Sequence, residues 1–114
     1  MANLRRQIIV TTEWIGFHSW DDAPDEVAFL RNKHRHKFYC RVALPVSHND
    51  RDKEFFMVKR GLNEFVADFS VFNDSCEGYA EMLLEEFDAD WVEVFEDGEN
   101  GARVDRCLDL GSSN

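Results

Sequence analysis

Residues 31–46 read RNKHRHKFYCRVALPV, and both the expected fold and the expected site depend on this stretch. Side chains alternate across a β-strand, so His34 and His36 point to the same face if the stretch is a strand. The apolar residues that follow show which face this is. In phase with the two histidines lie Phe38, Cys40, Val42 and Leu44. Both imidazoles are therefore expected on the apolar side of the strand.

An earlier strand is expected over residues 4–18, and it ends on a third histidine, His18. In phase with this histidine are Ile8, Val10, Thr12 and Trp14. If the two strands pair as neighbours, the three imidazoles converge. Three neutral imidazoles with an open position form the ligand set of a catalytic-type zinc site, so we expect Zn²⁺ bound by His18, His34 and His36. The alternative is that these are polar residues at strand ends, satisfied by backbone or water.

The length of 114 residues fits one domain over residues 1–114, with a tail from about residue 109. Ten Phe and three Trp argue against disorder. No apolar run approaches the roughly 20 residues of a membrane span, and MANLRRQIIV turns polar too early for a signal peptide. Cys40, Cys76 and Cys107 show no CxxC spacing and are expected as reduced thiols. These features predict a cytoplasmic protein.

The formal net charge of −10 disfavours general binding to nucleic-acid phosphates. The charge is uneven, because residues 61–102 contain acids but no lysine or arginine. A basic run comprises Arg31, Lys33, Arg35, Lys37 and Arg41. Charged side chains in such runs usually form a solvated surface. The alternative for the basic run is a binding site for an anion such as phosphate beside the histidines.

The remaining chain predicts two helices followed by two strands. The expected elements after the loop 19–33, which has helical character near 26–30, are a strand over 34–47, helices over 53–69 and 75–87, and strands over 90–96 and 102–108. The first helix has an apolar stripe of Phe55, Val58, Leu62, Phe65 and Phe69. Asp74 and Glu77 form an Asp-type capping box for the second helix. Asp97-Gly98 and Asn100-Gly101 are turn signals. The predicted class is α+β, with two helices on one face of a four-stranded antiparallel sheet.

Glu96 lies in phase with Val92 and Val94, which face inward on the third strand. A carboxylate on an apolar face must be paired or hydrogen-bonded. One interpretation is that it receives two adjacent N–H donors of a planar heterocycle. The other is that it points to water at the strand end.

From about residue 8 to residue 106, the order of these motifs resembles the superfamily of 6-pyruvoyl-tetrahydropterin synthase and 6-carboxytetrahydropterin synthase, whose fold is the tunnelling fold or T-fold. In that family one zinc histidine lies on the first strand and an HxH pair opens the second. The family's later motifs are one at the strand-to-helix junction, one that opens the second helix, and a Val-x-Val-x-Glu strand. Similar to them, in this order, are Glu54-Phe55 with Val58 and Lys59, Ser75-Cys76-Glu77, and Val92, Val94 and Glu96. The resemblance implies a ββααββ fold and substrate binding by Glu96 and Glu77, although capping alone also explains Glu77.

The chain departs from the family at three places. The family's cysteine before HxH is missing from residues 29–33, and its Asp-His pair is missing between the two helices, where residues 70–74 read SVFND. Arg35 stands where the family has glycine. The metal site and the ligand anchor are thus retained, while the usual acid and base residues are not.

The resemblance implies a zinc-dependent lyase of pterin or queuosine biosynthesis, acting on a substrate like dihydroneopterin triphosphate or a deazapurine precursor. The general base is unknown. Cys76 is a candidate because a helix dipole lowers the pKa of a thiol in the first turn. The alternative is that Cys76 is a small buried side chain that only fills space in the core. Cys40 is expected in the hydrophobic core, and His48 is expected in the turn after the second strand. The family also implies a homo-oligomer with sites between subunits. The alternatives are a T-fold protein that binds a pterin- or purine-like ligand without turnover, and an acidic interaction module that mimics nucleic acid.

Overall fold

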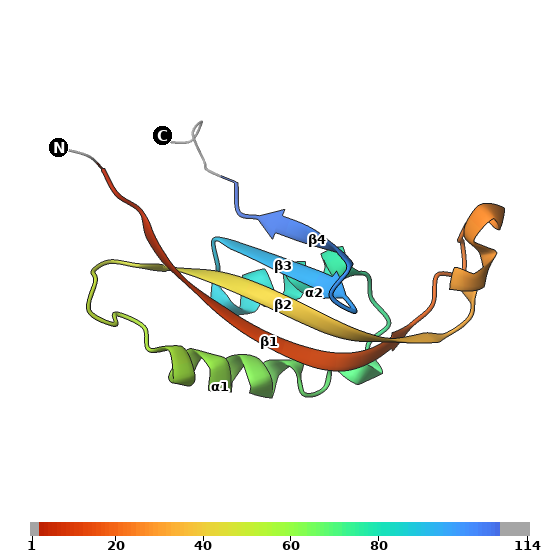
Figure 1. Cartoon of the computed structure of the whole chain (residues 1–114), viewed down its shortest axis with the longest axis horizontal. Coiled ribbons are helices and arrows are strands. Elements are labelled where there is room, and N and C mark those ends of the chain that lie inside the picture. Colours follow the sequence, from red (N-terminus) through yellow and green to blue (C-terminus); the bar gives the residue numbers. More distant parts are fainter. Residues whose placement is uncertain (1–2, 108–114) are drawn as a thin grey trace.

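The computed structural model describes residues 3–107, and over these residues the chain forms one antiparallel sheet and two α-helices (Figure 1). The strands are β1 (Arg6–His18), β2 (His34–Val46), β3 (Trp91–Glu96) and β4 (Asn100–Asp105), in the order β1-β2-β3-β4. The helices are α1 (Phe55–Val66) and α2 (Cys76–Phe87), with short 3-10 helices η1 (Asp25–Arg31) and η2 (Phe69–Val71). The predicted α+β class and the four-stranded antiparallel sheet are confirmed. The predicted tail from residue 109 and the end of the predicted strand 102–108 lie outside the described residues.

The longest feature is the hairpin of β1 and β2, two strands of 13 residues each. Their register runs from Arg6 opposite Val46 to His18 opposite His34. The hairpin extends beyond both helices and carries the loop with η1 at its tip (Figure 1). Because His18 ends β1 and His34 begins β2, the three histidines lie at the end of the hairpin that carries η1.

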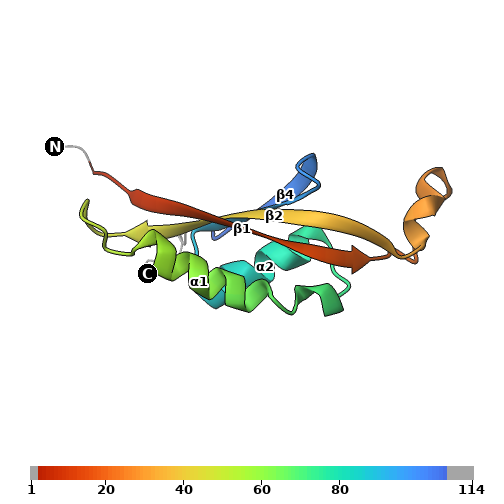
Figure 2. The same ribbon diagram turned by 60° about the horizontal axis from the view of Figure 1, so that its bottom comes forward.

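Both helices pack on the same face of the sheet (Figure 2). This face is the apolar one that the alternation predicted, since Val10, Trp14, Phe38, Val42 and Val92 are all buried there. An aromatic cluster fills the space beneath the strands and consists of Trp14, Phe38, Phe69 and Tyr79. Gly16 allows this packing, because a Cβ at Gly16 would lie 2.7 Å from the Phe38 ring. The core therefore ends directly beside the histidines.

Two expectations about the helices are wrong. Phe55 is 59% exposed, because it only opens α1. The rest of the predicted stripe packs on the core, with Leu62 and Phe69 buried and Val58 and Phe65 partly buried, although α1 ends at Val66 and Phe69 lies in η2. The N-cap of α2 is Ser75 and not Asp74: the Ser75 hydroxyl accepts a hydrogen bond from the N–H of Gly78 at 3.0 Å. The helix begins one residue later than expected, so the predicted capping box of Asp74 and Glu77 does not form.

The turn between β3 and β4 is made by Asp97, Gly98 and Glu99. Asp97 and Gly98 both have positive φ, at 54° and 74°, as the predicted Asp-Gly turn requires. The second predicted turn, Asn100-Gly101, is wrong. Because three residues complete the reversal, Asn100 already pairs with Glu96 at the start of β4.

The sheet face away from the helices carries charged side chains and several aromatic ones, among them Trp91, Tyr39 and Phe95. Glu93 accepts hydrogen bonds from its cross-strand neighbours Arg41, at 2.9 Å, and Arg103, at 3.3 Å. Both guanidinium groups lie over the ring of Trp91, which is only 9% exposed. Long charged side chains thus cover the tryptophan on this face. No helix over residues 3–107 is long and apolar enough to cross a membrane.

Candidate metal centre

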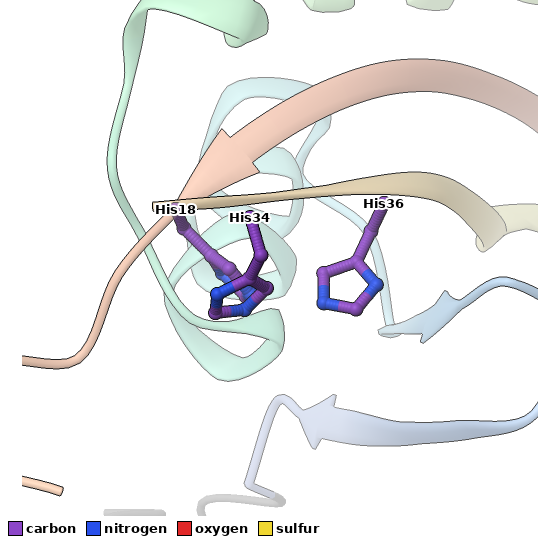
Figure 3. Close-up of side chains that lie close together, drawn as sticks. All are labelled: His18, His34 and His36. Atoms are coloured by element: carbon purple, nitrogen blue, oxygen red, sulfur yellow. The ribbon is translucent and has the colours of Figure 1, made fainter. Parts of the chain in front are cut away.

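The three predicted histidines meet at one point (Figure 3). His18 ends β1 and pairs with His34 at the start of β2, while His36 follows two residues later on the same face. The ring centroids are 4.4 Å apart for His18 and His34, 4.8 Å for His34 and His36, and 5.0 Å for His18 and His36. One ring nitrogen from each histidine lies within 4.8 Å of the other two. These three side chains could therefore hold a metal ion.

Each of the three imidazoles has its Nδ1 atom engaged with an oxygen. His18 Nδ1 donates to the carbonyl of Asp74 at 2.9 Å, His34 Nδ1 to the carbonyl of Asn32 at 2.8 Å, and His36 Nδ1 to the Asp97 carboxylate at 2.6 Å. The acceptors are two backbone carbonyls and a carboxylate whose pKa is lowered, first by this bond from His36 and then by the N–H of Lys37. None of these three oxygen acceptors has a proton to donate, so in each hydrogen bond the proton is on Nδ1 of the histidine.

This arrangement fixes the tautomer of each neutral ring and leaves the lone pair on Nε2. Histidines that ligate a metal commonly donate the other ring N–H to a carboxylate or a backbone carbonyl, which orients the ring and raises its basicity. The donor set of three nitrogens suits zinc with a further coordination position left over. The residues present thus fit the ion that the sequence predicts.

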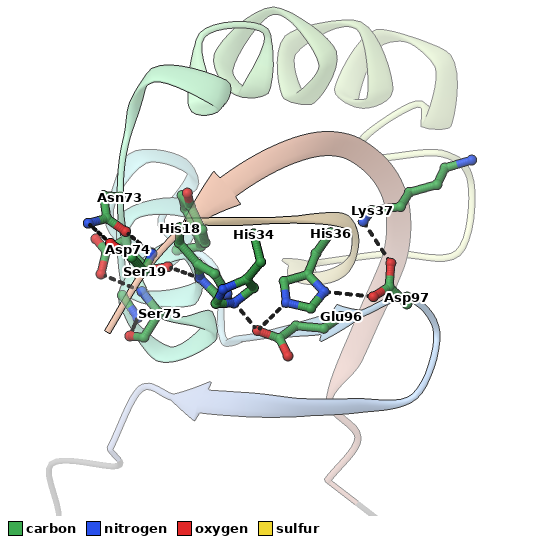
Figure 4. A network of polar contacts seen from close by, with 12 residues as sticks. His18, Ser19, His34, His36, Lys37, Asn73, Asp74, Ser75, Glu96 and Asp97 are labelled. Carbon is green, nitrogen blue, oxygen red and sulfur yellow. Dashed lines mark hydrogen bonds and ion pairs between the residues drawn. The ribbon is translucent and has the colours of Figure 1, made fainter. Parts of the chain in front are cut away.

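Glu96 reaches the same point from the end of β3 (Figure 4). It is opposite Phe38 in the register, on the same face as His36. Its Oε2 atom lies 3.3 Å from His18 Nε2 and 3.9 Å from His36 Nε2. The side chain is 31% exposed, so it neither points fully to water nor is fully buried.

A pocket of about 890 Å³ opens above these residues. The three histidines and Glu96 line it, together with residues of the η1 loop, of the segment before α2 and of β4. Three further acidic residues, Asp74, Glu77 and Glu99, are among the lining residues, and none of the described lining residues is a lysine or an arginine. The pocket therefore favours metal cations and groups that donate hydrogen bonds.

The expected basic run does not lie beside the histidines. Lys37 and Arg41 are on the opposite face of β2, because they alternate with the histidines, and they pair with Glu13 and Glu93. Arg31 pairs with Asp25 beside η1 at 2.8 Å. Three of the five basic side chains that the sequence suggested as a phosphate site are therefore paired with acids.

Cys76 lies in the first turn of α2 as predicted, but its thiol is not activated. Burial, followed by the negative charges of Glu96 and Glu77, raises the pKa of Cys76 to about 12. The expected lowering by the helix dipole is therefore wrong, because desolvation and nearby carboxylates outweigh it. Glu77 itself is exposed and lines the pocket.

The other two candidates lie away from the centre. Cys40 is buried in the core, as expected, and burial raises its pKa to about 12. His48 lines a separate pocket with Arg6, Arg51 and Lys53.

Two groups of side chains at the candidate site were missed from the sequence. Asp97 orients His36, and the only signal for it is that it directly follows Glu96 in an Asp-Gly turn. Trp20 and Phe29, which are 50% and 69% exposed, line the pocket from the η1 loop. Exposed aromatic rings at a pocket are suited to stacking on a flat ligand.

The three cysteines should differ sharply in reactivity at pH 8, in protein stripped of metal by a chelator. Cys107 is exposed and should react with iodoacetamide in minutes. Cys40 and Cys76 should react only after unfolding, because burial disfavours both thiolates and a thiol with a pKa of about 12 stays protonated at this pH. Peptide mass spectrometry over a time course measures the three rates. Labelling of Cys76 as fast as that of Cys107 would contradict the raised pKa.

No protein-family model matches the sequence, and a search of curated proteins finds no significant match.

Proposed function

We propose that the protein binds zinc through His18, His34 and His36 and uses the adjoining pocket for a pterin-like or deazapurine-precursor heterocycle, as a T-fold relative of the 6-pyruvoyl- and 6-carboxy-tetrahydropterin synthases. The observation that carries the proposal is the set of three Nδ1 hydrogen bonds, which leaves the Nε2 lone pairs free in a cluster where one ring nitrogen of each histidine lies within 4.8 Å of the other two. The order β1-β2-α1-α2-β3-β4 of the main elements supports the T-fold assignment.

When bound, zinc would act as a Lewis acid that polarises a substrate oxygen and acidifies a neighbouring C–H or O–H group. The chain's own residues would position the ligand. Glu96, and at the pocket rim Glu77, would accept hydrogen bonds from ring N–H groups. Trp20 and Phe29 would cover one face of a flat ring.

A second candidate is binding without turnover. The raised pKa of Cys76 favours it, because this thiol is a poor proton acceptor at neutral pH. The lyase and the binding protein share the same metal and ligand site, so only product formation separates them.

We expect about one zinc ion per chain in protein purified without a histidine tag, measured by mass spectrometry of the metal content. The double variant His34→Ala/His36→Ala should lose it, since it removes two of the three nitrogen ligands. His48→Ala is the matched control, because His48 lies in a separate pocket. Absence of metal from the wild type, or its retention in the double variant, would refute the site.

Glu96→Ala should weaken the binding of neopterin by roughly tenfold or more, because it removes a charge-assisted pair of hydrogen bonds. Fluorescence titration of the pterin measures this. Glu86→Ala is the control, since Glu86 is an exposed glutamate on α2 that does not line this pocket. Equal affinity in wild type and Glu96→Ala would count against the anchor. Incubation with dihydroneopterin triphosphate, followed by chromatography, then reports whether the bound compound is turned over.

The protein should be a homo-oligomer whose sites lie between subunits. The T-fold resemblance predicts this, and the pocket supports it: a triphosphate would find no cationic side chain among the described lining residues and would need cations from a neighbouring chain. The strands β1 and β4 end the sheet and leave edges open to pairing. Light scattering at micromolar concentration measures the mass, and a monomer would exclude the shared site.

A further inference from the structure

We propose that Glu96 is a fourth zinc ligand in the protein without substrate, so that the resting site is closed by three histidines and one glutamate. This inference rests on the proposed zinc site and assigns Glu96 a role in addition to that of a ligand anchor. The carboxylate reaches the histidine cluster from β3, and Figure 4 shows it directed at the nitrogens of both His18 and His36.

The distances support this assignment. Ligands of a tetrahedral zinc ion at 2.0–2.2 Å lie roughly 3.3 Å from one another. The Oε2 atom of Glu96 is 3.3 Å from His18 Nε2 and 3.9 Å from His36 Nε2. The spacing to His18 is that of two ligands on one ion, and the spacing to His36 needs a shift of about half an ångström.

The surroundings hold Glu96 in this place. Its strand position opposite Phe38 is fixed by the sheet register, and Phe38 is fully buried. Cys76 lines the same pocket as Glu96, at the start of α2. The next residue, Asp97, accepts hydrogen bonds from His36 Nδ1 and from the N–H of Lys37, which ties the end of β3 to the ligand strand.

The competing interpretation is a plain ion pair between Glu96 and protonated His18, with no part in metal binding. Both interpretations place the oxygen near the nitrogen, so the distance alone does not separate them. They differ in what metal does: a ligand strengthens metal binding and fills the fourth position, whereas an ion pair is broken when the metal binds.

A ligating Glu96 also has a consequence for the ligand. One carboxylate oxygen cannot hold the metal while it anchors the N–H groups of a heterocycle. Binding of the heterocycle should therefore draw Glu96 away from the histidines and open the fourth position only when the pocket is filled.

The test uses cobalt(II) in place of zinc, because the visible absorption of cobalt reports its coordination. Wild type, Glu96→Gln and the control Glu86→Gln, at an exposed glutamate of α2 outside the pocket, are each loaded and scanned from pH 6 to pH 9. Zinc affinity is measured by competition with a chromophoric chelator. A water in the fourth position titrates near pH 7, so an open site has a pH-dependent spectrum. Circular dichroism checks that each variant folds.

We expect pH-independent spectra for wild type and Glu86→Gln, a pH-dependent spectrum for Glu96→Gln, and zinc affinity lower by at least about tenfold in Glu96→Gln only. Neopterin added to the cobalt-loaded wild type should change its spectrum. If Glu96→Gln matches the wild type in affinity and spectrum, or if neopterin binds without a spectral change, the assignment is overturned while the zinc site stands. If the wild type binds no metal, the zinc site and this assignment both fail.

Discussion

The antiparallel pairing of β1 with β2 is the constraint on which the candidate site depends. Its register sets His18 opposite His34 and Gly16 opposite His36. Since side chains alternate along a strand, a slip of one residue would move the histidines of one strand to the other face. The buried side chains Val10, Trp14 and Phe38 prevent such a slip, because it would expose them to water. The hydrophobic core and the histidine cluster are thus specified by the same alternation.

The site is assembled from segments far apart in the chain. The rings come from the β1-β2 hairpin, while their Nδ1 acceptors come from the segment before α2, from the loop before β2 and from the β3-β4 turn. Each acceptor belongs to a different part of the fold. The histidines are therefore oriented only when helices, loops and sheet are all in place, which is typical of a site preorganised by its surroundings.

Much of this could be predicted from the sequence, because it rests on local patterns. Period-two alternation placed the strands and the common face of the histidines, and it put Glu96 in phase with Val94. The features that were missed depend on tertiary contacts. Backbone carbonyls such as those of Asn32 and Asp74 have no side-chain signature, so their role as acceptors is invisible in the sequence. The helix dipole suggested a reactive Cys76, but burial and the charge of Glu96, which come from packing, reverse the direction of its pKa shift.

The charged side chains of Arg41, Glu93 and Arg103 form a ladder on the outer face of the sheet, and this ladder affects the position of Glu96 in the candidate metal centre on the inner face. Arg41, Glu93 and Arg103 sit directly opposite one another on three successive strands, and both arginines also stack over Trp91. Moving β3 or β4 by two residues would preserve the inside-outside pattern but would separate these partners. The ladder thus discriminates between registers that hydrophobicity alone treats as equal. The charged pairs on the solvent-facing side of the sheet therefore help to set the distance along β2 between the Glu96 carboxylate and the histidines.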